Sequence, residues 1–508
     1  MITEVFTAST FGVDAYIIRE ETHIENGLFA FAIVGLPDNA VKESRERVAA
    51  AVKNSMFHFP IRRYTVNLAP ADVKKEGSGF DLPIAIGILS ETSQVSPLKI
   101  KDYLFVGELS LDGKLRSISG VLPITLEAKK NSFKGIILPF ENAKEAAIVE
   151  GIDVLPFETL TEVIDFLNNE ICPQPFRVDV KKIFEQDRNY LVDFADVKGQ
   201  AEVKRGMEVA ASGSHNIIMI GLPGSGKTML AKRLPTILPP LTLEEALETT
   251  KIHSIAGILP GSSAIISTRP FRSPHHTASD VSLVGGGPNA KPGEISFSHN
   301  GVLFLDELTE FKKNVLEVMR QPLEDRIVTI SRSKITVQYP CNFMLVAAMN
   351  PTPAGSQKEA SMYSEYDVQK FLAKISGPIL DRIDIHIHVN PVKYQDLSSK
   401  AEHERSEKVR ERVVKARDIQ LKRFKDRKGI YSNSNMTTKE IKEFCKVDSD
   451  SENLMKMAIT KLGLSARAYD RILKVSRTIA DLSTEENISA AHISEAIQYR
   501  SLDRTSWI

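Results

Sequence analysis

A glycine-rich loop between an apolar run and a helix-forming segment carries the clearest chemistry in this sequence. The β-branched run Ile217–Ile220 leads directly into the pattern Gly221-x-x-x-x-Gly226-Lys227-Thr228. Such a loop turns consecutive backbone N–H groups toward phosphate oxygens, and the N-terminus of the next helix adds its positive end. The lysine of this pattern reaches the β and γ phosphates, and the threonine holds Mg²⁺. We therefore expect ATP and Mg²⁺ to bind at Gly221, Leu222, Pro223, Gly224, Ser225, Gly226, Lys227 and Thr228.

Two carboxylates follow a second apolar run, Val302–Leu305. Asp306, at the carboxyl end of this predicted strand, can bind Mg²⁺ through water, and Glu307 can polarise the water that attacks the γ-phosphate. An apolar run that ends in Asp-Glu is common at strand ends, so this assignment depends on the phosphate loop upstream. Together with Lys227 and Thr228, the pair predicts ATP hydrolysis.

Two more polar residues stand at the ends of strand-like runs. Asn350 can contact the γ-phosphate or its water, although an Asn before Pro also commonly starts a turn, and both roles can hold. Arg382 precedes another run. In a ring-shaped ATPase an arginine at this place reaches the γ-phosphate of the neighbouring subunit and stabilises transition-state charge. The alternative is an ion pair within the chain, with Asp381 or Asp384.

These residues need a sheet to position them, and the sequence predicts one from about 194 to 392. Near-continuous apolar runs separated by helical stretches are typical of a parallel sheet covered on both faces, and therefore of a doubly wound α/β core. The four runs are Ile217–Ile220, Val302–Leu305, Phe343–Met349 and Ile383–Val389.

The remainder of the chain predicts further domains on both sides of this core. Downstream, 393–430 is densely charged and predicts a connecting helix over 398–428, either solvated or binding a partner. Residues 431–508 predict a small helical domain that starts with a capping box of Thr437 and Glu440.

Upstream, residues 1–170 predict a separate α+β domain, and 171–193 the linker after it. A hairpin turn is predicted at Asp112-Gly113. The predicted strands of this domain are Leu28–Val34 and Tyr64–Leu68. Its predicted helices are Val41–Met56, Leu82–Ser90 and Leu122–Lys130.

Composition limits the functional classes. The 508 residues are enough for about three domains, and 65 acidic residues balance 65 basic ones, so any basic surface must be local. The start, MITEVFTAST, has no cationic segment followed by an apolar core, and no stretch approaches about 18 apolar residues, which predicts a cytoplasmic protein without a membrane partner. Cys172, Cys341 and Cys445 have no paired spacing, so we expect reduced, structural cysteines.

The ordered motifs of the core resemble those of the AAA+ ATPases. These motifs are Val197-Lys198-Gly199-Gln200, GLPGSGKT, LFLDEL, AAMN and DRID. More narrowly, RPFRSPHHTAS from Arg269, KPGEISFSHNGVLFLD from Lys291 and LSARAYDR from Leu464 are similar to the magnesium-chelatase-like YifB/ComM family. The resemblance covers essentially the whole chain.

This resemblance implies a hexameric, ATP-dependent branch-migration helicase that is associated with competence. It would act on single-stranded or branched DNA in homologous recombination, with recombination or loading proteins as further partners. The resemblance also implies that Asn350 is sensor 1, that Arg382 is the arginine finger, and that Arg467, on a C-terminal helical lid, is sensor 2. It places Gln200 in the loop that borders the adenine. Several relatives carry a cysteine-rich run after the sensor asparagine, whereas 351–355 here contains no cysteine, so we expect no metal there.

The amino-terminal domain resembles the Lon-protease and ribosomal-S5 fold. The protease nucleophile aligns with Gly79, and the lysine of its dyad aligns near Leu122 to Ile124, where no lysine is present. Ser78 is a stand-in for the nucleophile, but a serine without an activating base is usually a turn residue. We therefore expect a non-proteolytic domain.

A cationic hairpin is predicted between Pro322 and Pro340, where two β-branched runs flank Ser331-Arg332-Ser333-Lys334. In related AAA+ helicases a hairpin at this place projects into the pore of the ring, where Arg332 and Lys334 would follow the phosphate backbone of DNA. The alternative is a solvated turn, since charged hairpin tips are common.

His275 and His276 form an obvious pair of metal ligands. Adjacent residues on a strand point to opposite faces, however, and no third ligand stands at a recognisable spacing. We expect a role in a subunit contact or in positioning DNA instead.

Two other functional classes use the same motor. A chelatase subunit or chaperone-like remodeller would act on a protein, although chelatase motors usually lack this amino-terminal domain and work with partner subunits. A proteolytic ATPase would need the dyad residues that are missing here. Stimulation of ATP hydrolysis by single-stranded, forked or Holliday-junction DNA separates these functions.

Overall fold

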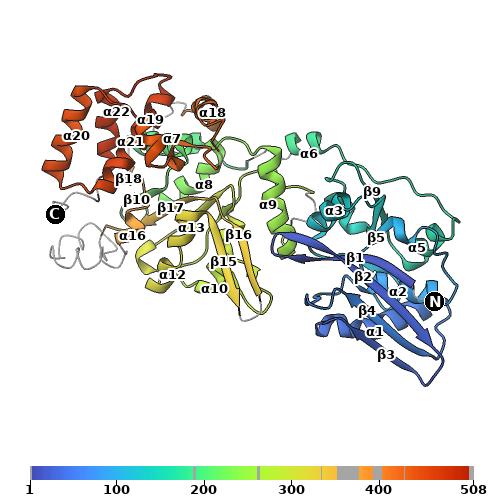
Figure 1. Cartoon of the computed structure of the whole chain (residues 1–508). Coiled ribbons are helices and arrows are strands. Elements are labelled where there is room, and N and C mark those ends of the chain that lie inside the picture. The colour runs from blue at the N-terminus through green and yellow to red at the C-terminus, as the bar shows by residue number, and fades with distance from the viewer. Residues whose placement is uncertain are drawn as a thin grey trace. The chain divides into compact units, whose positions relative to one another are not determined.

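The computed structural model describes residues 3–186, 190–259, 264–332, 335–351, 377–392, 403–427, 429–500 and 502. Its contacts divide the chain into two compact units (Figure 1). The first unit comprises residues 1–187, 243–267 and 337–339, and the second comprises 188–242, 268–336 and 340–508.

A seven-stranded mixed sheet organises the first unit. Its strands are β1 (Thr3–Phe11), β2 (Asp14–Glu25), β3 (Ala30–Val34), β4 (Arg63–Ala69), β5 (Tyr103–Phe105), β8 (Gly135–Pro139) and β9 (Asp153–Phe157). Their order is β3-β4-β2-β1-β5-β8-β9, with β2 antiparallel to both of its neighbours and the other pairs parallel. Along β4, Tyr64, Val66 and Leu68 are buried while the residues between them are not, so alternate side chains cover the core.

Helices pack on this sheet. They are α1 (Asn39–Asn54), α2 (Asp81–Glu91), α3 (Val121–Lys130), α4 (Ala143–Ala146) and α5 (Leu160–Leu167), and α6 (Val180–Gln186) follows them in the sequence. The first three confirm predicted helices, and α1 begins after Asp38, whose carboxylate accepts a hydrogen bond from the N–H of Val41 at 2.8 Å. The predicted hairpin is confirmed between β6 (Glu108–Leu109) and β7 (Leu115–Arg116), where Gly113 has a φ of 84°. The segment predicted as a plain linker contains α6.

The segment α9 (Leu243–Ala256) also belongs to the first unit and packs on α3. Ser254 of α9 donates through its hydroxyl to the carboxylate of Glu145, and its carbonyl accepts from the N–H of Gly120 at 3.0 Å. A segment from within the span predicted for the nucleotide-binding core therefore folds with the amino-terminal part of the chain.

A five-stranded parallel sheet organises the second unit. Across the sheet, the strands are β11 (Phe271–Arg272), β14 (Val302–Leu305), β17 (Met344–Met349), β10 (Ile217–Ile220) and β18 (Ile385–His388). Every residue of β10, β14 and β17 is buried, as expected for strands covered on both faces. The four predicted strands are confirmed, whereas β11 is too short to give a sequence pattern.

Helices and a second, smaller set of strands complete this unit. The helices nearest the sheet are α7 (Ala201–Gly213) and α8 (Lys227–Ile237). Between β11 and β18 lie α10 (Asp280–Val284), β12 (Gly285–Gly286), β13 (Lys291–Pro292), α11 (Glu294–Phe297), α12 (Lys313–Glu317), α13 (Arg320–Asp325) and α16 (Gly377–Leu380). The predicted hairpin is present as a two-stranded sheet of β15 (Ile327–Arg332) and β16 (Ile335–Pro340).

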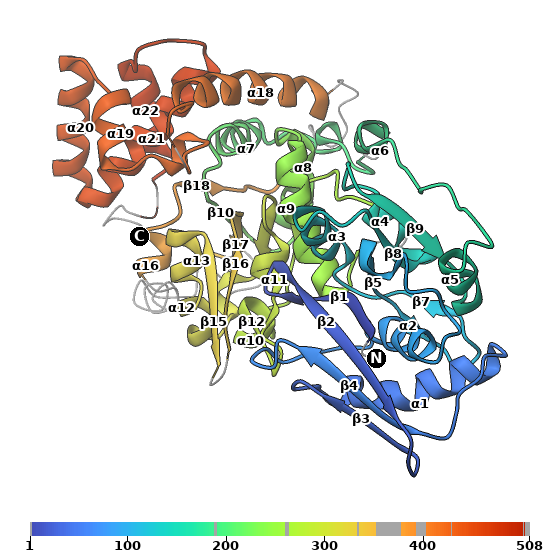
Figure 2. The same ribbon diagram turned by 45° about the vertical axis from the view of Figure 1, so that its right-hand side comes forward.

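The carboxy-terminal helices are α18 (Ser406–Arg423), α19 (Thr438–Phe444), α20 (Ser449–Leu462), α21 (Ala466–Leu482) and α22 (Ala490–Gln498). Figure 2 shows α18 lying along α7, where Arg417 donates to the carbonyls of Ala211 and Ser212 at 3.0 and 3.1 Å. The predicted capping box of Thr437 and Glu440 is confirmed. The predicted connecting helix begins later and ends earlier than 398–428, and its residues 398–402 lie outside the described part of the chain. No described helix is both long enough and apolar enough to span a lipid bilayer.

Candidate active site

The predicted phosphate loop lies at the carboxyl end of β10 and leads into α8. Gly224 and Gly226 have φ values of +77° and +95°, and a Cβ atom built on either would meet nothing within 4 Å. These glycines permit a backbone that side chains rarely adopt, and they leave an open cradle beside the loop. The hydroxyl of Ser225 is buried with no hydrogen-bond partner among the described residues. An open, donor-rich loop of this kind suits a phosphate group.

Lys227 lies within this loop. Its Nζ donates to the carbonyls of Gly221 and Leu222 at 2.6 and 3.0 Å, and to Oδ1 of Asn350 at 3.2 Å. Burial lowers the pKa of Lys227, while Asp306 and Glu307 act to raise it. Two predicted site residues from distant segments are thus in direct contact: Lys227 at the start of α8, and Asn350 just after the strand that ends at Met349.

Thr228 and Asp306 also contact each other. They follow β10 and β14, which end at the same edge of the described sheet and are separated there by a single strand, β17. The hydroxyl of Thr228 donates to Oδ2 of Asp306 at 2.7 Å, and Oδ1 of Asp306 accepts from the N–H of Glu307 at 3.0 Å. Hydroxyl and carboxylate oxygens are the ligands that Mg²⁺ prefers. The chemistry of this donor pair fits the cation that the phosphate loop implies.

Glu307 makes a contact that the sequence did not predict. Its Oε2 lies 3.1 Å from Nδ1 of His276, and its own backbone is left-handed, with a φ of 53°. His275 and His276 lie in a turn rather than a strand, so their rings are not on opposite faces but 4.1 Å apart between centroids. Neither residue belongs to a group of three potential metal ligands within the described ranges. No local signal reveals the contact, because it depends on β11 lying beside β14.

Gln200 links the phosphate loop to the segment just after β18 through hydrogen bonds. Its side-chain amide donates to the carbonyl of Ser225 at 3.0 Å and to the carbonyl of Asn390 at 3.1 Å. Its backbone has a φ of 55° and stands at the start of α7. The residue that the family resemblance places beside the adenine therefore bonds to the main chain of the loop.

Arg382 and Arg467 lie at the other edge of the sheet. Asn216, which immediately precedes β10, donates through Nδ2 to the carbonyl of Arg382 at 2.9 Å. The side chain of Arg382 pairs with Glu324, and that of Arg467 pairs with Asp381 at 2.5 Å. Burial lowers the pKa of Arg382, and Arg467, Arg471 and Arg320 add to this effect by repulsion between like charges. The carboxylate that pairs with Arg382 among the described residues is that of Glu324, whereas Asp381 pairs with Arg467.

The hairpin carries Arg332 at the end of β15, where its side chain is exposed. A Cβ atom on Gly286 would come within 2.7 Å of Nη2 of Arg332, so this guanidinium lies against β12. Lys334 lies outside the described residues, as do residues 352–355 of the segment that lacks cysteine.

Ser78 in the first unit has an acidic partner that the sequence did not predict. Its hydroxyl donates to the carboxylate of Glu108, and Arg116 lies 3.8 Å from the same carboxylate. A carboxylate is a weak base for a serine hydroxyl because its ordinary pKa is near 4. Gly79 is packed instead, since a Cβ atom there would meet the side chain of Ile118 at 3.5 Å.

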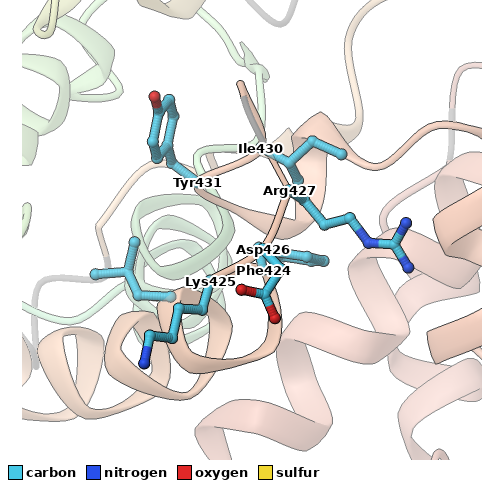
Figure 3. A pocket seen from close by; sticks show the side chains of 7 residues that line it. Phe424, Lys425, Asp426, Arg427, Ile430 and Tyr431 are labelled. Atoms are coloured by element: carbon cyan, nitrogen blue, oxygen red, sulfur yellow. The ribbon is translucent and has the colours of Figure 1, made fainter.

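A separate hollow of about 470 Å³ lies at the carboxyl end of α18 (Figure 3). None of the predicted site residues lines it. Its lining consists of Leu421, Phe424, Lys425, Asp426, Arg427, Ile430 and Tyr431.

The chain is similar to known proteins along its whole length. Three protein-family descriptions match the chain. Residues 20–142 match "Subunit ChlI of Mg-chelatase", and residues 193–397 match "Magnesium chelatase, subunit ChlI". Residues 403–500 match "Magnesium chelatase, subunit ChlI C-terminal". The competence protein ComM of Haemophilus influenzae is 43% identical over 503 residues, which are 98% of this chain and 97% of that protein. YifB of Escherichia coli is 41% identical over 504 residues, again 98% and 97%.

A shorter match extends to a protease. Lon protease 2 of Bacillus subtilis is 29% identical over 117 residues, which are 22% of this chain and 21% of the protease. With the parallel sheet and the carboxy-terminal helices, these matches confirm the predicted fold class, an AAA+ core with a helical end after a Lon-like α+β domain.

Proposed function

Because the chain belongs to the YifB/ComM family of magnesium-chelatase-like AAA+ ATPases, we propose that it couples ATP hydrolysis to the movement of DNA strands. The process would be branch migration in homologous recombination and natural transformation, in the cytoplasm. The observation that carries the ATPase part is the hydrogen bond from Thr228 to Asp306 at 2.7 Å beside the buried ammonium group of Lys227.

The residues of the site divide the chemistry among them. When bound, MgATP supplies the phosphoanhydride bond to be hydrolysed, and Thr228 and Asp306 hold the cation. The Lys227 ammonium neutralises phosphate charge, and Asn350, 3.2 Å from it, orients the attacking water. Glu307 accepts the proton of that water as the general base.

The positions of Arg382 and Arg467 support a ring. The four residues of β10 separate these arginines from the phosphate loop of the same chain, which corresponds to roughly 13 Å of extended strand. Arg382, and Arg467 through its pair with Asp381, therefore lie near the end of β10 opposite to their own phosphate loop, and we propose that they act on ATP held by the neighbouring subunit. A homo-hexamer gives every site such a neighbour.

The hairpin supplies the DNA part of the proposal. The exposed Arg332 and, next to it in sequence, Lys334 would contact phosphates without reading the base sequence. The name of the relative ComM, a competence protein, is consistent with a DNA substrate. The matches to magnesium chelatase models favour a second candidate, in which the same motor remodels a protein partner.

The rate of ATP hydrolysis with and without DNA tests the proposal. We expect single-stranded, forked or Holliday-junction DNA to stimulate ATP hydrolysis by the full-length protein, and a labelled junction to be resolved into its branch-migrated products only with ATP. A rate that no DNA structure changes would reject the DNA substrate and leave the ATPase itself unaffected.

A further inference from the structure

Nδ1 of His276 lies 3.1 Å from Oε2 of Glu307, within the distance of an ion pair. Imidazole N–H groups donate and carboxylate oxygens accept, so the side chain of His276 is a potential donor to Glu307. The contact involves one carboxylate oxygen and leaves the other to accept from a water. The histidine can therefore hold the base without occupying the atom that the base needs.

Glu307 requires such an anchor. Its side chain is 55% exposed, and it extends from a backbone with a φ of 53°, at the point where β14 gives way to a short 3-10 turn. A general base must lie within hydrogen-bond reach of the proton that it abstracts. A displacement of about 1 Å can cost about a hundred-fold in rate, so a long, half-exposed side chain is a poor base unless a neighbour restrains it.

The loop that carries His276 is itself fixed at both ends. Before it, β11 is paired with β14, and Arg272 makes two bonds to the carboxylate of Glu294, at 2.6 and 2.7 Å. After it, the hydroxyl of Ser279 caps the first turn of α10. The loop that carries the imidazole is thus held by contacts that involve neither Glu307 nor His275.

We propose that His276 is a positioning residue for the Glu307 carboxylate and directs it toward the water that attacks ATP. This inference rests on the proposed function, in which Glu307 is the general base. His276 touches the base rather than the phosphate loop, so it acts on the hydrolytic step and not on ATP binding.

Substitutions that move the donor atom test the proposal in steady-state ATP hydrolysis by the full-length protein. His276→Ala should lower kcat about ten- to a hundred-fold, with KM for ATP changed less than about three-fold. His276→Asn places an amide N–H close to the position of Nδ1 and should recover most of the activity. His276→Gln carries its donor one bond further out, near the position of Nε2, and should not recover the activity. Equal rates for the Asn and Gln variants, or a KM that changes as much as kcat, would overturn the proposal.

His275 provides the matched control. Its Nδ1 lies 2.9 Å from the hydroxyl of Thr277, in the same turn and against the same neighbouring ring, but it does not pair with Glu307. His275→Ala should therefore leave kcat within about three-fold of the wild type. A decrease as large as that of His276→Ala would assign the effect to the shape of the turn and would overturn the proposal.

The Glu307→Gln variant separates this inference from the function on which it rests. When His276→Ala is added to Glu307→Gln, kcat should fall by less than about a further two-fold, because the carboxylate that His276 positions is already gone. If Glu307→Gln hydrolysed ATP at the wild-type rate, the assignment of the base would be wrong. If Glu307→Gln were inactive but His276→Ala had a wild-type kcat, only the role of His276 would be rejected.

Discussion

The side-chain amide of Asn216 donates to the carbonyl of Arg382 at 2.9 Å and thereby holds this arginine at the amino-terminal edge of the parallel sheet. The next four residues are β10, whose other end leads into the phosphate loop. Arg382 at one end of this strand and Lys227 beyond its other end therefore belong to two different faces of one subunit. In a ring, such faces meet across the interface between neighbours.

Arg382→Ala should therefore leave ATP affinity nearly unchanged and lower hydrolysis by roughly 10³- to 10⁵-fold, the usual value of an arginine supplied by a neighbour. ATP affinity is measured by titration of a fluorescent nucleotide. Mixed rings of Arg382→Ala and Glu307→Gln subunits should regain some activity, because some interfaces then contain one intact site. An absence of rescue in rings shown to be mixed would argue for a role within one chain.

Lys227→Ala should abolish nucleotide binding, since it removes the ammonium group from the loop between the Gly221 carbonyl and Asn350. Glu307→Gln should instead bind ATP and hydrolyse it about two to four orders of magnitude more slowly. Equilibrium binding and single-turnover hydrolysis distinguish the two variants. Retained binding by Lys227→Ala would place the phosphates elsewhere.

Replacing both Arg332 and Lys334 with Ala should weaken DNA binding about equally for all sequences. The dependence of log K on log salt should flatten by roughly 0.7 to 0.9 for each DNA phosphate that the variant no longer neutralises. Basal ATP hydrolysis should survive, because the exposed Arg332 is not in the nucleotide site, while strand displacement should fail. A double variant with wild-type affinity and salt slope would remove the hairpin from the DNA path and favour a protein substrate.

Glu20 of the first unit predicts a dependence of stability on pH. Its carboxyl group is fully buried on β2, Oε1 accepts from the hydroxyl of Thr22, and Oε2 has no partner among the described residues. Burial raises the pKa of Glu20 well above its ordinary value. The folded state therefore keeps a proton that the unfolded state releases, and stability falls as the pH rises above the unfolded pKa.

Glu20→Gln should remove this penalty, which grows by about 1.4 kcal/mol per pH unit between the unfolded and folded pKa values. The melting temperature of the variant should exceed that of the wild type at pH 8, and the difference should shrink toward pH 5. Glu21→Gln is the control, because Glu21 is partly exposed and bonds to Asn67 at 2.8 Å. A pH-independent difference for Glu20→Gln would mean that the buried group does not titrate.

Local patterns in the sequence predicted the parts of the site that lie within one short segment. The loop from Gly221 to Thr228 and the pair Asp306-Glu307 each follow a buried strand directly, so their positions at the carboxyl edge follow from strand direction alone. The contact of Lys227 with Asn350 could be anticipated in the same way, because parallel strands end at the same edge. These features can be predicted without knowing the order of the remaining strands in the sheet.

Other features depend on the order of the strands and on contacts between distant segments. The pairing of β11 with β14 brings His276 to Glu307, and a two-residue strand leaves no periodicity from which to predict it. Likewise, α9 lies within the sequence span predicted for the core, yet its Ser254 bonds to Glu145 and Gly120 of the first unit. The sequence by itself determined the identity of the chemical groups, because backbone direction and residue type are local properties. Only the tertiary structure decided which of those groups meet, because contacts between segments far apart in the chain depend on packing over the whole core.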